Sequence, residues 1–190
     1  MKKLVCTLLV LAMLCSFMVV NVSAANTYES KGFELVMDYD ANFERDSFNY
    51  GGNGTYYNCE IESLESKIEI LEGDVGCMMA LMGVESIDEI NTCKDLYEYT
   101  AIALGNTGDT ESIVINGAPA TVCFSRDLTF CTIIQYSDNY FYYMEFGADN
   151  KEKLNTIYDI IVDGFVITDS VSDFTVDAVI EDEDDATKMD

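Results

Sequence analysis

Apolar and polar residues alternate strictly from Phe33 to Phe43. The apolar side chains of one face are Phe33, Leu35, Met37, Tyr39, Ala41 and Phe43. The positions between them are acidic or polar, apart from one valine. A period of two with one apolar face is typical of a half-buried β-strand. The pattern therefore predicts a strand, or a pair of strands, in this stretch.

The segment that follows is harder to assign. Residues 49–55 read Asn-Tyr-Gly-Gly-Asn-Gly-Thr and predict a loop, because glycine disfavours regular elements. Residues 59–72 fit either a helix or a strand, since their apolar positions keep helical spacing while the last few alternate. Beyond a glycine-flanked turn, the chain becomes continuously apolar. We favour a hairpin that pairs strand 66–71 with strand 76–82.

Two helices are indicated by their caps and their periodicity. Ser86 and Glu89 have the three-residue spacing of a capping box. The apolar face of the helix that they open carries Ile90, Cys93, Tyr97, Ala101 and Leu104. This helix is expected to end at Gly105. Asp149 or Asn150 is expected to cap the second helix. Its apolar face carries Leu154, Ile157, Tyr158 and Ile161.

The second half of the chain has the pattern of an antiparallel meander. Asn116-Gly117 is a strong signal for a two-residue hairpin turn, because both residues accept a positive φ. Further turns are expected near Arg126-Asp127 and at residues 137–139. The strands between these turns are predicted at residues 112–115, 118–124, 129–136 and 140–146, with a last short strand at 164–167. Strand 140–146 is apolar on both faces and is therefore expected at the centre of the sheet.

These elements predict an α+β fold with a mainly antiparallel sheet of about six strands flanked by two helices. Residues 26–168 are enough for a single domain with a real core. Residues 169–190 are polar and strongly acidic, so we expect a disordered tail there.

The first 25 residues have the pattern of a signal peptide. Lys2 and Lys3 precede an apolar run from Leu4 to Val20, and Ser23-Ala24-Ala25 offers the small residues that signal peptidase reads. A transmembrane anchor is the alternative, but the run is near the lower limit for spanning a bilayer. We therefore expect a secreted protein, extracellular or in the cell envelope, with no membrane span after cleavage.

The excess of acidic side chains limits the classes of partner that the protein can bind. The chain carries 35 acidic and 10 basic side chains, for a net charge of −25. Nucleic acids and anionic membrane surfaces would be repelled over most of such a surface. The charge either keeps a secreted domain soluble or attracts a cationic or protein partner. No histidine is present, so histidine-based triads and zinc sites are excluded, and no cofactor is expected.

Five cysteines lie beyond the signal peptide, an odd number for an exported protein. If the turn that follows the strand 118–124 centres on Asp127, Cys123 lies directly opposite Cys131 on one face of the hairpin. Opposed Cβ atoms in a hairpin are close to bonding range. The register therefore predicts a disulfide between Cys123 and Cys131.

Acidic residues suggest two weaker candidate sites, one for calcium binding and one for hydrolysis. Asp38, Asp40 and Asn42 place oxygens at alternate positions, as a calcium loop does. Phe43 stands where such a loop needs glycine, and the strand pattern explains the same acids as a solvated face. A pair of carboxylates elsewhere in the chain would suit glycoside hydrolysis, although no particular pair stands out.

Several segments resemble the PsbP-like fold, that of the extrinsic photosystem II protein and of exported bacterial domains of unknown function. The likeness lies in segments 32–36, 86–90, 115–120, 140–143 and 160–165, which read GFELV, SIDEI, INGAPA, YFYY and IIVDGF. It spans residues 32–168. The family's proline-tryptophan pair after the first strand is replaced by Tyr-Asp-Ala-Asn at residues 39–42. No functional residue of the family carries over, and the resemblance implies binding or assembly more than catalysis.

The sequence as a whole predicts a secreted, non-catalytic binding or interaction module whose ligand it does not name. No catalytic residue is assigned. The alternative is a small secreted hydrolase that uses a carboxylate pair. A hydrolase should hold two facing carboxylates with shifted pKa values in a concave site, whereas a module should show a shallow surface.

Overall fold

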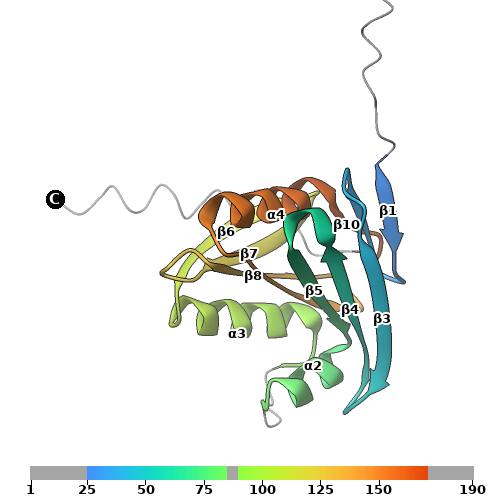
Figure 1. The fold of residues 1–190 in the computed structure, drawn as a ribbon. Helices are drawn as coiled ribbons and strands as arrows, with labels where there is room; N and C mark the ends of the chain where they lie inside the picture. Colours follow the sequence, from blue (N-terminus) through green and yellow to red (C-terminus); the bar gives the residue numbers. More distant parts are fainter. Residues whose placement is uncertain (1–24, 85–89, 171–190) are drawn as a thin grey trace, which may run out of the picture.

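The computed structural model describes residues 25–84 and 90–170 (Figure 1). Its strands in chain order are β1 (Asn26–Glu29), β2 (Phe33–Met37), β3 (Asn42–Asn49), β4 (Asn53–Ile61), β5 (Ser66–Gly73), β6 (Asp109–Ile115), β7 (Ala118–Phe124), β8 (Phe130–Tyr136), β9 (Phe141–Gly147) and β10 (Phe165–Ile167). Its helices are the 3₁₀ turn η1 (Glu62–Leu64) and the α-helices α2 (Val75–Leu81), α3 (Cys93–Gly105) and α4 (Lys151–Gly164).

The strands form two antiparallel sheets. The larger has seven strands in the order β3-β4-β5-β9-β8-β7-β6, and the smaller has three in the order β1-β2-β10. β9 lies in the middle of the larger sheet, as its apolar character on both faces predicts. The predicted α+β class with an antiparallel sheet is confirmed. The larger sheet has seven strands where about six were expected, and the described residues contain three α-helices where two were expected.

The elements stack in three layers, with the seven-stranded sheet in the middle (Figure 1). On one face, α2 and α3 pack over a smaller apolar cluster. On the other face, α4 and the three-stranded sheet cover the main core. Covering both faces explains why the central strands carry so few exposed side chains.

Local sequence signals set several boundaries. Asn116 and Gly117 have φ values of 48° and 87°, and they form the two-residue turn between β6 and β7. The Asn150 side chain accepts a hydrogen bond from the backbone N–H of Lys153 and caps α4, as predicted. On α4, Leu154, Ile157 and Ile161 are buried against the sheet.

The prediction of a strand at residues 76–82 is wrong, because this run forms α2. Asp74 caps the helix, and its carboxylate accepts a hydrogen bond from the backbone N–H of Cys77 at 2.9 Å. A short apolar run fits a buried helix as well as a strand, and here the cap decides. The predicted strand 66–71 is part of β5, which pairs with β4 and β9 instead of with residues 76–82. Residues 59–72, which fitted either a helix or a strand, belong to β4 and β5 and to the 3₁₀ turn η1 between them.

Two other boundaries differ from expectation. The predicted capping box at Ser86 and Glu89 lies outside the described residues. The helix itself begins at Cys93, where Thr92 and Asp95 form a capping box, and it ends at Gly105 as predicted. The predicted loop at 49–55 is shorter, because β4 already starts at Asn53.

The predicted disulfide between Cys123 and Cys131 is contradicted by the register. Cys123 pairs with Thr132, and Cys131 pairs with Phe124, one residue away from the expected pairing. Neighbouring positions on a strand face opposite sides, so the two thiols lie on different faces of the sheet. Six residues lie between the paired Phe124 and Cys131, so the centre of the connection falls between Asp127 and Leu128 instead of on Asp127. Leu128 has a φ of 54° in this connection. All five cysteines among the described residues are free and buried.

The described residues continue to Ser170, two residues beyond the predicted end of the domain at 168. The Asp169 carboxylate accepts hydrogen bonds from Ser137 and Asn139, and Ser170 bonds to Asp138. The rest of the predicted tail lies outside the described residues. So does the predicted signal peptide, apart from Ala25. None of the described helices has both the length and the apolar character needed to cross a bilayer.

Candidate functional site

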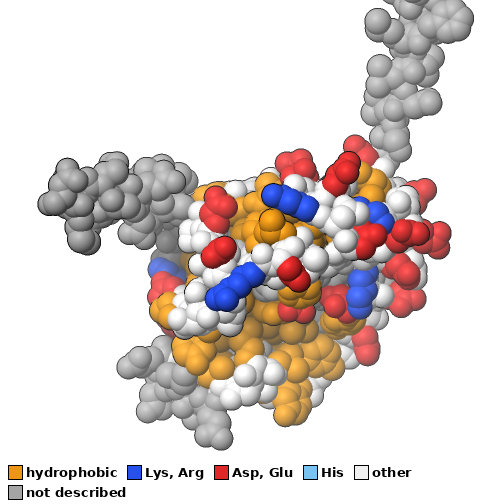
Figure 2. Space-filling model, turned by 60° about the vertical axis from the view of Figure 1, so that its left-hand side comes forward, with side chains coloured by type: hydrophobic (Ala, Val, Ile, Leu, Met, Phe, Trp, Pro, Cys, Tyr) orange, Lys and Arg blue, Asp and Glu red, His pale blue; other side chains and the backbone are white. Residues whose placement is uncertain are grey.

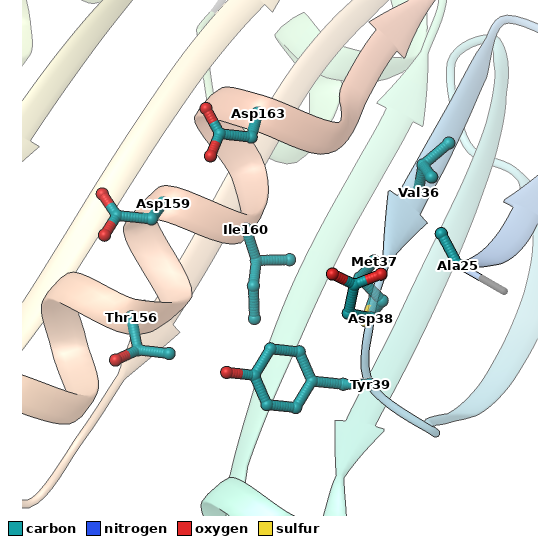
Figure 3. Close-up of a pocket in the computed structure, with 9 residues that line it drawn as sticks. All are labelled: Ala25, Val36, Met37, Asp38, Tyr39, Thr156, Asp159, Ile160 and Asp163. Carbon is teal, nitrogen blue, oxygen red and sulfur yellow. The ribbon is translucent and has the colours of Figure 1, made fainter. Parts of the chain in front are cut away.

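An open hollow of about 430 Å³ lies between α4 and the end of β2 (Figure 3). We call it the α4–β2 groove. Its lining residues are Ala25, Val36, Met37, Asp38, Tyr39, Thr156, Asp159, Ile160 and Asp163. They come from the N-terminal segment, from β2 with the turn that follows it, and from α4 between Thr156 and Asp163.

Gly164 sets the spacing between the two walls of this groove. A Cβ atom at this position would lie well under 3.0 Å from the backbone carbonyl oxygen of Val36. Only glycine lets the end of α4 approach the β2 backbone this closely. The glycine therefore fixes where the helix and the strand diverge to form the groove.

The floor of the groove is apolar and its rim is acidic. Met37 and Ile160 are buried, whereas Asp38, Asp159 and Asp163 are exposed. In Figure 3, Ile160 and the Tyr39 ring point into the space between α4 and β2, while the carboxylates of Asp159 and Asp163 lie on the outer side of the helix. We call Asp38, Asp159 and Asp163 the acidic rim. These carboxylates border the groove without converging on one point.

Asp163 has an unfavourable position in its helix. It lies in the last turn of α4, which carries no basic residue. The partial negative charge at a helix C-terminus disfavours an acid there by about 0.3–1 kcal/mol at low salt. A bound cation would offset this repulsion, so the local electrostatics favour a cationic ligand at this end of the groove.

A second open hollow adjoins the first and shares Asp38 and Tyr39 with it. Asp40, Asn42 and Glu62 also line this hollow. All three residues of the calcium candidate, Asp38, Asp40 and Asn42, therefore border one open space. The Asp40 carboxylate accepts a hydrogen bond from Asn26, and the Asn42 amide donates one to Glu44. Within residues 25–84 and 90–170, histidine, cysteine and acidic side chains form no group of three that could hold a metal ion. The calcium hypothesis thus gains no support from the geometry.

Acidic and apolar surfaces occupy different parts of the molecule. In Figure 2, the acidic side chains gather in the upper half, and the lower half, over α2 and α3, is largely apolar. Leu81, Tyr99 and Ile102 are 43%, 43% and 73% exposed there. A hollow of about 480 Å³ between α2 and α3 is lined mainly by methionine, leucine and tyrosine side chains.

One carboxylate is buried inside the protein. Glu72, on β5, is 3% exposed and accepts a hydrogen bond from the Tyr57 hydroxyl at 2.7 Å. The Ser30 hydroxyl donates a second, longer one at 3.4 Å. Burial raises the pKa of the Glu72 carboxyl, while the hydrogen bonds and the nearby Lys31 oppose this rise.

The Glu72→Gln variant is expected to be more stable than the wild type above the pKa of Glu72. The folded-state pKa is raised, so the stabilising contribution of the protonated acid is complete below the unfolded pKa of about 4.3 and is lost as pH rises through the folded-state value. Glutamine keeps the shape and avoids the buried charge. Urea unfolding of both proteins between pH 4 and 8 measures the difference. Curves that stay parallel across this range would contradict the expectation.

The chain was also compared with known proteins. No protein-family model matches it, and no curated protein matches it. Among solved structures, it is similar to the solution structure of cyanobacterial PsbP (CyanoP) from Synechocystis sp. PCC 6803, with a TM-score of 0.44 and 9% sequence identity. The match covers 78% of this chain and 95% of the other. This solved structure belongs to the fold family that the sequence segments resemble. At so low an identity and TM-score, the likeness carries no argument about the site or its ligand.

The α4–β2 groove does not hold the facing pair of carboxylates that the hydrolase alternative requires. Two carboxylates would have to face each other across a site. Asp159 and Asp163 are directed away from Asp38 (Figure 3), and Glu72 is shielded from solvent. Sequence reasoning named Asp38 but missed Asp159 and Asp163. Their four-residue spacing on the predicted helix was the available signal, since it places both on one face.

Proposed function

We propose that this protein is a secreted, non-catalytic binding module that holds a cationic partner at the α4–β2 groove. The observation that carries this function is the lining of the groove, which combines an apolar floor with three carboxylates and, among the described residues, contains no lysine or arginine. The predicted signal peptide supports secretion.

This lining fits the amphipathic side chain of a lysine or arginine. An alkyl stem would pack on Ile160 and Tyr39, and the charged end would reach the acidic rim. The net charge of −25 adds a long-range field that speeds the approach of a cationic partner and weakens with salt. Each exposed ion pair contributes only about 0.5 kcal/mol, so single contacts are weak and several must act together.

Binding of a capped pentalysine peptide to the purified protein tests this function. We expect calorimetry at 50 mM salt to show binding that weakens as salt is added. The double variant Asp159→Asn, Asp163→Asn should bind about fivefold more weakly, since two exposed ion pairs are lost.

A matched control separates the groove from the overall charge. The double variant Asp46→Asn, Glu111→Gln also removes two exposed carboxylates, on β3 and β6, but neither residue lines the groove. It should bind the peptide like the wild type, apart from a small uniform loss. Equal weakening by both double variants would show that net charge alone attracts the peptide, and would overturn the assignment of the groove.

A further inference from the structure

Glu72 lies directly beneath the N-terminal strap, which we define as residues 25–32. The strap consists of Ala25, β1 and the turn that leads into β2. β1 is an edge strand of the small sheet, has four residues and pairs only with β2. Its side chains are exposed or half-buried. Its one large apolar side chain, Tyr28, packs on Phe43 of β3, and the Tyr28 hydroxyl and the Asn26 amide form hydrogen bonds with residues 39–41. Apart from these contacts, the strap is held by its pairing with β2 and by the bonds of its turn to the larger sheet.

The turn of the strap is bound to the carboxylate and its neighbours. The Ser30 hydroxyl donates to Glu72 Oε1 and accepts hydrogen bonds from the backbone N–H groups of Gly32 and Phe33, at 3.1 and 2.9 Å. The Tyr142 hydroxyl donates to the Gly32 carbonyl at 3.0 Å. A Cβ atom on Gly32 would lie 2.5 Å from Glu72 Oε1. The backbone of the strap is thus the layer that separates this carboxylate from water.

Few charges compensate an ionised Glu72. The titratable groups around it are Tyr57 on β4, Tyr140 and Tyr142 on β9, and Lys31 in the strap. The Tyr57 hydroxyl donates a hydrogen bond to the carboxylate, and burial raises the pKa values of all three tyrosines, so they stay neutral. Lys31 is exposed, and its positive charge opposes the rise in the pKa of Glu72.

We propose that the strap is a pH-sensitive latch, closed when Glu72 is protonated and released when Glu72 is ionised. Lifting the strap gives the carboxylate access to water, which removes the cost of burying its charge. Ala25, at the start of the strap, lines the α4–β2 groove, so release also removes part of the groove wall. This coupling to the groove rests on the proposed function, but the latch does not.

The difference in the pKa of Glu72 between the closed and the open strap determines how strongly opening depends on pH. The open strap leaves Glu72 with an ordinary pKa near 4.3, while the closed strap raises it. Between these two values, the equilibrium constant for opening rises about tenfold for each unit of pH. Below and above this window it is constant. The strap therefore opens as pH rises, in contrast to the charge-driven unfolding of proteins in acid.

Hydrogen exchange of the backbone amides tests the latch without any ligand. Exchange of residues 26–33 is measured from pH 5 to 8.5, corrected for the intrinsic pH dependence and compared with amides of β8. In the wild type, protection of the strap should fall across the window while β8 stays protected. In Glu72→Gln, the protection of the strap should not depend on pH.

Two further variants complete the test. Glu69→Gln removes a carboxylate from the opposite face of β5 and should behave like the wild type. Gly32→Ala should hold the strap away from Glu72 and lower its protection at every pH. Parallel pH dependence of the strap in the wild type and in Glu72→Gln would overturn the latch. So would strong protection at every pH in both. Neither result bears on peptide binding at the groove, so failure of the latch and failure of the proposed function are distinguishable.

Discussion

Replacing Gly164 with alanine is expected to destabilise the protein by about 3 kcal/mol or more. The added methyl group would overlap the backbone carbonyl of Val36, and a backbone atom cannot move aside as the end of a side chain can. Either α4 shifts away from β2 or its last turn unwinds. Both responses change the walls of the α4–β2 groove, so binding of pentalysine should weaken together with stability.

The matched control is Gly105→Ala at the end of α3. There the nearest atom to an added Cβ is the Thr110 hydroxyl oxygen at 3.6 Å, an ordinary contact. This variant should be as stable as the wild type or slightly more so, because alanine favours the helix. Urea midpoints with unchanged m-values give both results. Equal stability of the two variants would show that α4 is free to move relative to β2.

Replacing Phe33 with alanine is expected to lower the free energy of unfolding by about 3–5 kcal/mol. Phe33 is fully buried, and its ring centroid lies 4.8 Å from that of Phe165 and 5.1 Å from that of Tyr57. These contacts join β2 and β10 of the small sheet to β4 of the large one. The variant loses the buried ring and leaves a cavity between the two sheets.

Phe130→Ala is the comparison for Phe33. Phe130 is 39% exposed at the start of β8, so water can fill the space that its ring leaves. Its loss should cost less than about 1.5 kcal/mol. The unfolding temperatures of the two variants, each compared with the wild type, measure the two losses of stability. Similar costs would mean that the two sheets do not depend on Phe33 for their contact.

Sequence patterns predicted the parts of the fold in which local and long-range preferences agree. The turn at Asn116-Gly117 needs two positive φ values, and these residue types provide them. Asn150 caps α4, and the buried face of that helix has helical spacing. β9 is apolar on both faces and is central because both sides are covered.

The errors arose where a pattern fits two structures or where geometry decides. Residues 77–82 are apolar without a period, so only the cap at Asp74 distinguishes a helix from a strand. One extra residue in the loop after β7 moved Cys123 and Cys131 to opposite faces. The sequence also offered no sign that Glu72 would be buried, because its position follows from the strap that folds over it, far away along the chain.

The buried thiols divide between the two sides of the central sheet. Cys59 and Cys131 lie in the core under α4, and Cys93 lies in the cluster under α3. Burial raises the pKa of each of these thiols to about 12. Almost none of them is therefore present as the reactive thiolate while it stays buried in the folded protein. The labelling rate of each cysteine therefore reports how often the structure around it opens. The rate at which an alkylating reagent labels Cys93, compared with Cys59, measures how often the α3 side opens relative to the α4 side in the native protein.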